Sequence, residues 1–312
     1  MAPMEGSVEN HTGWVRALAA VRKTPGEMDG WEKDSDEKRH EQGNPGGGSM
    51  WRFSAACNYV RVWDDQFEED EEGGCVRDVL SVKIFTGDIL ALAAGSLPED
   101  GDRSQSAGER QPLRRLFCGV ADGTVRGWDV AQADSPLAAS RAPDLTPLPS
   151  AVSAHDARVA ALVLRPPWLI SGCLGGTLHV HDAVDLSAPG AAAREGRDGP
   201  NTCGTAAHEG AVRALCVGPG GLVYSGGDDG WIRAWRLDEA SGRLAPAGQW
   251  RNPSEKPRGA EGEDDGREGE LGRGGKSAGV RALCALFAAD RDEECVGMVA
   301  GDGGGGLTLW MT

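Results

Sequence analysis

The sequence has few large aromatic side chains other than tryptophan, and it has no long apolar run. Only 5 phenylalanines and 2 tyrosines occur in 312 residues. No stretch of about 18 apolar residues is present, so a membrane-spanning helix is not expected. The opening segment, MAPMEGSVENHTGW, lacks the basic and apolar parts of a secretory signal. These absences predict an intracellular protein, cytoplasmic or nuclear, that does not bind a membrane.

The cysteines lack the spacing of metal ligands. There are 8 of them, and neither a Cys-x-x-Cys pair nor a histidine-rich spacing accompanies them. Cys216 and Cys284 close matching apolar phrases, so we expect them at buried strand positions. Free thiols of this kind fit a reducing compartment. The sequence therefore predicts no metal and no other cofactor.

The motifs of common catalytic sites are also missing. The patterns GxSxG, HExxH and GxxxxGK[ST] do not occur in the chain. Residues 272–277, GRGGKS, end like a phosphate-binding loop, but Glu270 stands where that loop requires its first glycine. We therefore predict that the protein is not an enzyme.

Basic residues are outnumbered, and the formal net charge is −16. This charge argues against binding to nucleic acid over the whole surface, because proteins hold the phosphate backbone with Lys and Arg. The expected partners are other proteins, and the chain is expected to be a subunit of a complex.

Tryptophan and glycine, by contrast, are plentiful, with 10 and 47 residues. Short apolar phrases recur in groups of three, and the first phrase of each group alternates with the period of a half-buried strand. These first phrases are WVRALA (14–19), ILALAA (89–94), VAALVL (159–164), VRALCV (212–217) and VRALCA (280–285). Four of the five groups end on tryptophan. Three-strand units repeated in this way predict an all-β repeat architecture.

One repeat carries a complete motif, formed by His208, Ser225, Asp229 and Trp235. This pattern resembles the WD-repeat β-propeller family (transducin β-like). The resemblance implies an all-β propeller of four-stranded blades, in which the four side chains form a structural hydrogen-bonded network. A buried indole N–H needs an acceptor, so such a network is physically reasonable. We therefore expect these residues to be structural and not catalytic.

The other four repeats keep part of the motif. The retained positions, which the resemblance assigns to the same network, are His11, Ser54, Trp63, Asp122, Trp128, His155, Ser171 and Trp310. In the third repeat, Gly175 and His181 stand where the family has Asp and Trp.

We predict a single propeller domain over 1–312, in which polar, Gly-rich and charged inserts separate five blades. The blades are expected at 8–66, 76–130, 151–184, 205–238 and 276–312. The disordered or low-complexity inserts are expected at 22–48, 96–112, 131–153, 185–203 and 240–276. The family usually has seven blades, so the chain is a fragment, a closed ring of five, or a larger ring with unrecognised blades. The inserts have too little apolar alternation to hide whole blades, which favours five blades and leaves closure of the ring open.

In the family, partner contacts cluster three and five residues after the histidine position and just before the turn aspartate. The resemblance places candidate partner-binding residues at Trp14, Arg16, Arg158, Arg213, Asp228 and Arg281. Trp and Arg are favoured at interfaces, and Arg binds carboxylates and phosphates in a bidentate manner. We expect an acidic or phosphorylated partner here. The alternative is that these arginines pair with acidic loops of the protein itself.

The function predicted from these features is a non-catalytic protein–protein interaction scaffold or adaptor. The alternative is a substrate receptor of a cullin-type ubiquitin ligase, since some WD-repeat proteins present Trp-Asp-x-Arg to such a ligase. Here the closing phrases WDDQ (63–66) and WDVA (128–131) lack the arginine, which weakens the alternative.

Overall fold

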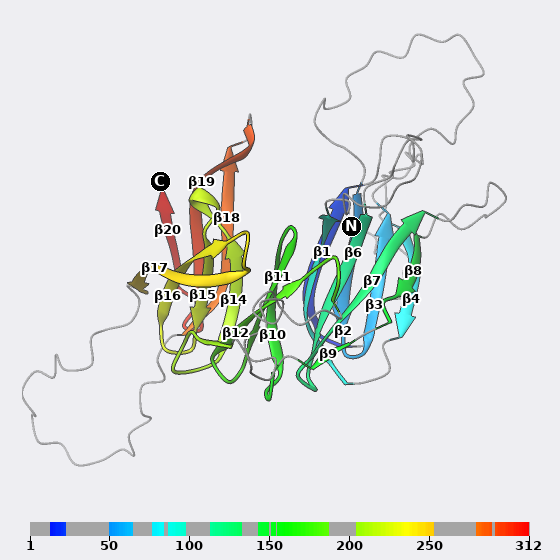
Figure 1. Ribbon diagram of the computed structural model, residues 1–312, viewed down its shortest axis with the longest axis horizontal. Coiled ribbons are helices and arrows are strands. Elements are labelled where there is room, and N and C mark those ends of the chain that lie inside the picture. The colour runs from blue at the N-terminus through cyan, green and yellow to red at the C-terminus, as the bar shows by residue number, and fades with distance from the viewer. Residues whose placement is uncertain are drawn as a thin grey trace, which may run out of the picture. The chain divides into compact units, whose positions relative to one another are not determined.

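The computed structural model contains two compact units, Met1–Val152 and Ser153–Thr312, which are described separately below (Figure 1). The regular elements in the described residues are strands and one short 3-10 turn. No helix in this described part is long and apolar enough to cross a membrane. The structure describes residues 13–22, 50–64, 77–83, 87–97, 113–132, 143–149, 151–153, 155–186, 204–252, 279–288 and 291–311.

The first unit contains two antiparallel sheets. Sheet 1 has the strand order β1 (Val15–Arg22), β2 (Met50–Ala56), β3 (Tyr59–Asp64) and β4 (Arg77–Lys83). Sheet 2 has the order β5 (Ile89–Leu97), β6 (Leu113–Val120), β7 (Thr124–Gln132) and β8 (Pro143–Pro147). The two-residue strand β9 (Val152–Ser153), at the boundary of the units, also pairs with β7.

The second unit contains three antiparallel sheets. Sheet 3 consists of β10 (Val159–Arg165), β11 (Trp168–Cys173), β12 (Thr177–Asp182) and β13 (Thr205–Ala206). Sheet 4 consists of β14 (Val212–Val217), β15 (Val223–Gly227), β16 (Trp231–Asp238) and β17 (Arg243–Arg251), and the 3-10 turn Pro219–Gly221 joins its first two strands. Sheet 5 consists of β18 (Val280–Ala288), β19 (Arg291–Asp302) and β20 (Leu307–Met311). The prediction of an all-β chain with five repeated sheets is confirmed.

In sheet 4, burial falls from the second strand to the fourth. All five residues of β15 are buried, whereas β17 is mostly exposed. In β15, Val223 packs in the core between sheets 3 and 4, and Tyr224 packs in the core between sheets 4 and 5. A strand covered on both faces in this way is apolar or small at every position, while an edge strand can be polar.

Each sheet begins with a β-bulge. In all five first strands the pairing register shifts after the first residue, so that the second residue has no partner opposite it. The unpaired residues are Arg16, Leu90, Ala160, Arg213 and Arg281. A bulge changes the alternation of a strand by one residue. As a result, Val212 and Leu215, three residues apart, both face sheet 3.

In sheets 4 and 5, the valine that precedes the bulge packs on a glycine of the preceding sheet. A Cβ atom on Gly172 would lie 2.6 Å from Cγ1 of Val212, and one on Gly226 would lie 2.5 Å from Cγ1 of Val280. Because real Cβ contacts are not this short, only glycine admits the valine. This packing fixes sheet 4 on sheet 3 and sheet 5 on sheet 4.

The outer strands differ from the sequence prediction. Strands β8 and β17 occupy Pro143–Pro147 and Arg243–Arg251, where inserts were expected over 131–153 and 240–276. For these residues the expectation of a loop is wrong, because edge strands need no apolar alternation. Strands β4 and β13 complete sheets 1 and 3, although the sequence groups them with the blades at 76–130 and 205–238. The fourth strand of a sheet therefore precedes the next repeat in the chain.

Candidate protein-interaction surface

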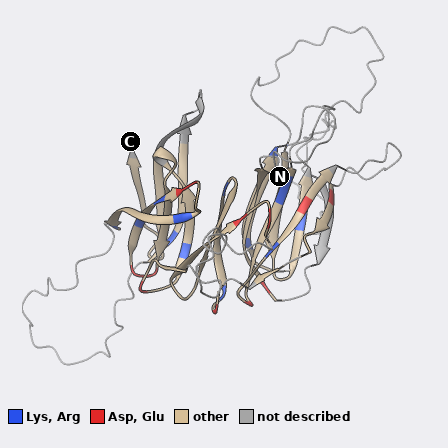
Figure 2. Ribbon diagram, in the orientation of Figure 1, with Lys and Arg blue, Asp and Glu red and all other residues tan. Residues whose placement is uncertain are grey.

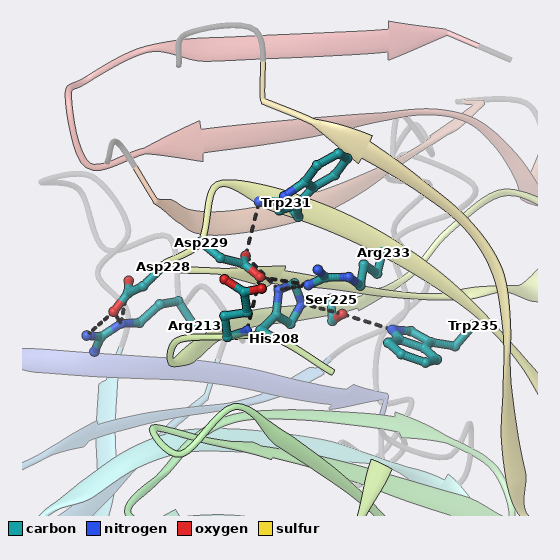
Figure 3. Close-up of polar contacts among 9 residues, drawn as sticks. His208, Arg213, Ser225, Asp228, Asp229, Trp231, Arg233 and Trp235 are labelled. Atoms are coloured by element: carbon teal, nitrogen blue, oxygen red, sulfur yellow. Dashed lines mark hydrogen bonds and ion pairs between the residues drawn. The ribbon is translucent and has the colours of Figure 1, made fainter. Parts of the chain in front are cut away.

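The four motif residues of sheet 4 form a continuous hydrogen-bonded chain (Figure 3). Nδ1 of His208 lies 2.8 Å from Asp229 Oδ1, and Nε2 of His208 lies 2.8 Å from Ser225 Oγ. Trp235 donates from its indole Nε1 to the same Ser225 oxygen over 2.9 Å. Ser225 is fully buried. Its hydroxyl is therefore shared between two ring nitrogens and is not accessible to a substrate.

Asp229 is also held by the strand that follows it. Arg233 donates to Asp229 Oδ2 over 2.8 Å, and the backbone N–H of Trp231 donates to Oδ1 over 3.1 Å. Burial acts to raise the pKa of Asp229, but the hydrogen bonds from His208 and Arg233 outweigh it and hold this pKa below its usual range. Asp229 is thus a charged structural group that joins the turn to the strand.

Sheets 1 and 2 contain parts of the same network. In sheet 1, Trp63 donates from Nε1 to Ser54 Oγ over 2.7 Å. In sheet 2, Asp122 Oδ1 accepts hydrogen bonds from the backbone N–H and the hydroxyl of Thr124, which stabilises the turn. Trp128 is buried in the core between the two sheets. His11, which the sequence assigns to this network, lies outside the described residues.

Sheet 3 replaces the tryptophan by histidine. Ser171 Oγ lies 2.8 Å from Nε2 of His155 and 2.8 Å from Nε2 of His181. Thr177 stands in for the aspartate, since its hydroxyl lies 3.1 Å from Nδ1 of His155. Burial lowers the pKa of His155 and of His181 to about 3, and a protonated imidazole at either position would also be repelled by a protonated His179. The network of sheet 3 is therefore held by neutral imidazoles.

Sheet 5 uses an asparagine that the sequence analysis missed. The backbone N–H of Asn252 donates to the carbonyl of Gly230, as that of His208 donates to Gly176. The Asn252 amide then donates to Asp302 Oδ2 over 3.3 Å. Asn252 thus takes the place of the motif histidine in the repeat of Trp310, which packs against the core between sheets 4 and 5.

Three of the six predicted rim residues form one ion-paired cluster, the rim cluster Arg213–Asp228–Arg281. Arg213 makes a bidentate contact, with Nε 3.0 Å from Asp228 Oδ1 and Nη2 2.8 Å from Oδ2. Nη1 of Arg281 lies 3.1 Å from Oδ1 of the same carboxylate. Figure 3 shows the contact of Arg213 and Asp228 beside the network of sheet 4. The pairing of rim arginines with the protein's own acidic residues is thus present at Arg213 and Arg281.

The other rim residues are solvent-exposed. Arg158 is exposed at the start of sheet 3, and its carbonyl accepts the N–H of Leu174 in the turn. Trp14 and Arg16 belong to the first unit, where Trp14 is 86% exposed. Figure 2 shows that the basic residues of the described strands occur in both units. The structure therefore brings together three of the six residues, all of them in the second unit.

The rim cluster carries more positive than negative charge. One carboxylate faces two guanidinium groups, so the cluster has one uncompensated positive charge. The side chains of Arg213 and Arg281 are 33% and 48% exposed, which leaves donors open to solvent. Within the described residues, no group of three or more His, Cys, Asp or Glu side chains is arranged to hold a metal ion.

Comparisons with known proteins show the fold. No protein-family model matches the sequence, and no curated protein is significantly similar to it. Among solved structures, Sqt1 from Chaetomium thermophilum matches with a TM-score of 0.51 and 15% identity, covering 98% of this chain and 57% of that chain. A chain of the mitotic checkpoint complex matches with a TM-score of 0.46 and 17% identity, covering 84% of this chain and 57% of that one. This chain therefore spans little more than half the length of either, and at such identities the likeness concerns the fold alone.

Proposed function

We propose that this chain, whose fold is that of a WD-repeat β-propeller, is a non-catalytic interaction scaffold that holds an acidic segment of a partner protein. The observation that carries the proposal is the recurring β-bulge, because three of its five unpaired positions are arginines, at Arg16, Arg213 and Arg281. A bulge redirects the side chain that it carries.

The rim cluster supports an acidic ligand over a neutral one. Asp228 binds Arg213 in a bidentate manner and also contacts Arg281, so both guanidinium groups are ordered before a partner arrives. Ordering in advance reduces the entropy lost on binding. Guanidinium groups then offer paired donors to a carboxylate or phosphate of the partner.

The motif histidines and serines support a scaffold over a hydrolase. Ser225 and Ser171 lie next to histidine nitrogens, as in a nucleophile–base pair, but both serines are fully buried. Each hydroxyl also has a second ring nitrogen within 2.9 Å, from Trp235 or His181. A nucleophile needs access to its substrate. We therefore assign a structural role to the motif histidines and serines.

The test measures binding of a short polyglutamate peptide, and separately of a phosphoserine peptide, by fluorescence polarisation. The double variant Arg213→Glu, Arg281→Glu is expected to lose affinity by about tenfold or more, because charge-assisted hydrogen bonds each contribute about 1.5–3 kcal/mol. Arg236→Glu is the matched control, since Arg236 is exposed on β16 at the end opposite the turn of Asp229.

Equal binding by the double variant and the control contradicts an acidic ligand at the rim. A wider test of the scaffold role is affinity purification with mass spectrometry on the same three proteins. If the set of recovered proteins is the same for the wild type and the double variant, the rim is not the partner surface.

A further inference from the structure

Sheet 4 carries a second group of basic and aromatic side chains at the end that holds the turn of Asp229. The guanidinium carbons of Arg233 and Arg251 lie over the ring of Trp231, at 5.9 Å and 5.8 Å from its centroid. We call Trp231, Arg233 and Arg251 the outer site. A cation this close to an indole face is attracted by the ring, so the contact orders a long side chain.

The strand register places the outer site at the same end of the sheet as the rim cluster. Trp231 is the first residue of β16, and it pairs with Arg251, the last residue of β17. Across the turn from Trp231, β15 ends at Gly227, which pairs with Val212, the residue before the bulge of Arg213. Arg213 and Arg251 therefore lie at one end of sheet 4, on its first and fourth strands.

The arginines of the outer site differ in their surroundings. Arg233 is bound to Asp229 over 2.8 Å, and Figure 3 shows Arg233 on one side of Asp229 and Arg213 on the other. Arg251 is exposed on the edge strand. A guanidinium group is planar and carries its donors at its edge. Arg251, held against Trp231, is therefore able to bind a carboxylate or phosphate in a bidentate manner.

The separation of the rim cluster and the outer site fits one extended peptide. Sheet 4 has the order β14-β15-β16-β17, so three strand spacings of about 4.8 Å, or about 14 Å in all, separate the strands of Arg213 and Arg251. An extended chain advances about 3.4 Å per residue and points every second side chain to the same side. Two acidic side chains four residues apart therefore face the same way, about 14 Å from each other.

We infer that the acidic segment of the partner crosses this end of sheet 4 as an extended chain, with one anionic side chain at the rim cluster and a second, four residues away, at Arg251. The inference rests on the proposed function and extends it, because the rim cluster supplies the first contact. The partner is then recognised by the spacing of its charges as well as by their sign.

Two fluorescent peptides of equal length and charge test the spacing by fluorescence polarisation at low ionic strength. Both contain two glutamates in a background of glycine and serine, four residues apart in the spaced peptide and next to each other in the adjacent peptide. Arg251→Gln is expected to weaken binding of the spaced peptide by about tenfold, because one bidentate contact is lost. Binding of the adjacent peptide should change by less than about twofold, since that peptide reaches the rim cluster alone.

Trp231→Leu is the second variant, and it is expected to weaken only the spaced peptide, by about threefold, because Arg251 loses the ring that orders it. The matched control is Arg243→Gln, which removes the same charge at the opposite end of β17 and should bind both peptides like the wild type. Circular dichroism checks the fold of each variant.

The double variant Arg213→Glu, Arg281→Glu separates this inference from the proposed function. If it loses both peptides while Arg251→Gln binds both like the wild type, or loses both equally, the rim site stands and the crossing to Arg251 is overturned. If neither peptide binds the wild type, the proposed function and the inference are both overturned. Selective loss of the spaced peptide in Arg251→Gln and Trp231→Leu supports the crossing.

Discussion

The Nε2 atom of His181 lies 2.8 Å from the Oγ atom of Ser171. In the next sheet the same distance, within 0.1 Å, separates the indole nitrogen of Trp235 from Ser225 Oγ, at 2.9 Å. Histidine thus replaces tryptophan and keeps the contact with serine. The replacement has a cost that tryptophan does not have, because an imidazole can become charged inside a core.

We expect the free energy of unfolding to fall as the pH is lowered below about 6.5, the ordinary pKa of histidine. Burial lowers the pKa of His155 and His181 in the folded protein to about 3. Between these two values the unfolded chain binds more protons than the folded one, so acid favours unfolding. Each site contributes a slope of at most about 1.4 kcal/mol per pH unit. Urea unfolding at a series of pH values from neutral to acidic measures the slope.

The variant that isolates this effect is His181→Gln, which keeps a polar side chain but cannot titrate. It should reduce the pH slope even where it lowers stability at neutral pH. Ser225→Ala is the control, because it damages the network of sheet 4 and leaves the histidines of sheet 3 in place. An unchanged slope for His181→Gln would show that other groups cause the acid sensitivity.

Ser225→Ala should itself destabilise the second unit. The substitution removes the partner of His208 Nε2 and of Trp235 Nε1, both in buried contacts. Each buried polar group left without a partner costs about 1–3 kcal/mol. Hydrogen-exchange mass spectrometry resolves the loss by segment, and Ser54→Ala is the comparison. Trp63 is less buried than Trp235, so a loss for Ser54→Ala as large as for Ser225→Ala would contradict the explanation from burial.

The sequence alone predicts the inner strands and the motif residues of sheet 4. The apolar alternation of these strands, and the occurrence of His208, Ser225 and Trp235 within one repeat, are patterns that burial imposes on the sequence. The bulges were not predicted, because β14 keeps the regular burial pattern of an unbroken strand although its register shifts at Arg213. The pattern records which residues are buried and not which face they occupy.

Other features depend on contacts between distant segments. Asn252 is separated from Gly279 by residues 253–278, so no fixed spacing marks it as the counterpart of a motif histidine. Strand β17 was missed because it is an exposed edge strand that contains Pro246, and its hydrogen bonds come from β16. For the rim arginines the sequence leaves two alternatives open, and the ion pair of Arg213 depends on where the turn places Asp228.

Asp228→Asn is expected to strengthen binding of the polyglutamate peptide by about threefold to tenfold, because the competing carboxylate loses its charge while its oxygen still orients Arg213. Stability should change by less than about 1 kcal/mol, since this ion pair is partly exposed to solvent. Fluorescence polarisation and urea unfolding measure the two effects. Weaker binding by Asp228→Asn would mean that Asp228 contacts the ligand or that the arginines lose their order without the charge.

Gly226→Ala should lower the free energy of unfolding, whereas Gly301→Ala, the same substitution at the equivalent position of sheet 5, should not. A methyl group on Gly226 would lie 2.5 Å from the stiff side chain of Val280, so sheets 4 and 5 must separate or distort. Overpacking of this kind costs about 1–3 kcal/mol. On Gly301 the nearest atoms lie at 3.5 Å and 3.7 Å, so the folded molecule accepts the methyl group.

Gly301→Ala should therefore unfold at the same urea concentration as the wild type or slightly above it, because alanine restricts the unfolded chain. Urea unfolding of both variants measures the difference. If Gly301→Ala destabilises the protein as much as Gly226→Ala does, the explanation from the packing of Val280 on Gly226 is wrong.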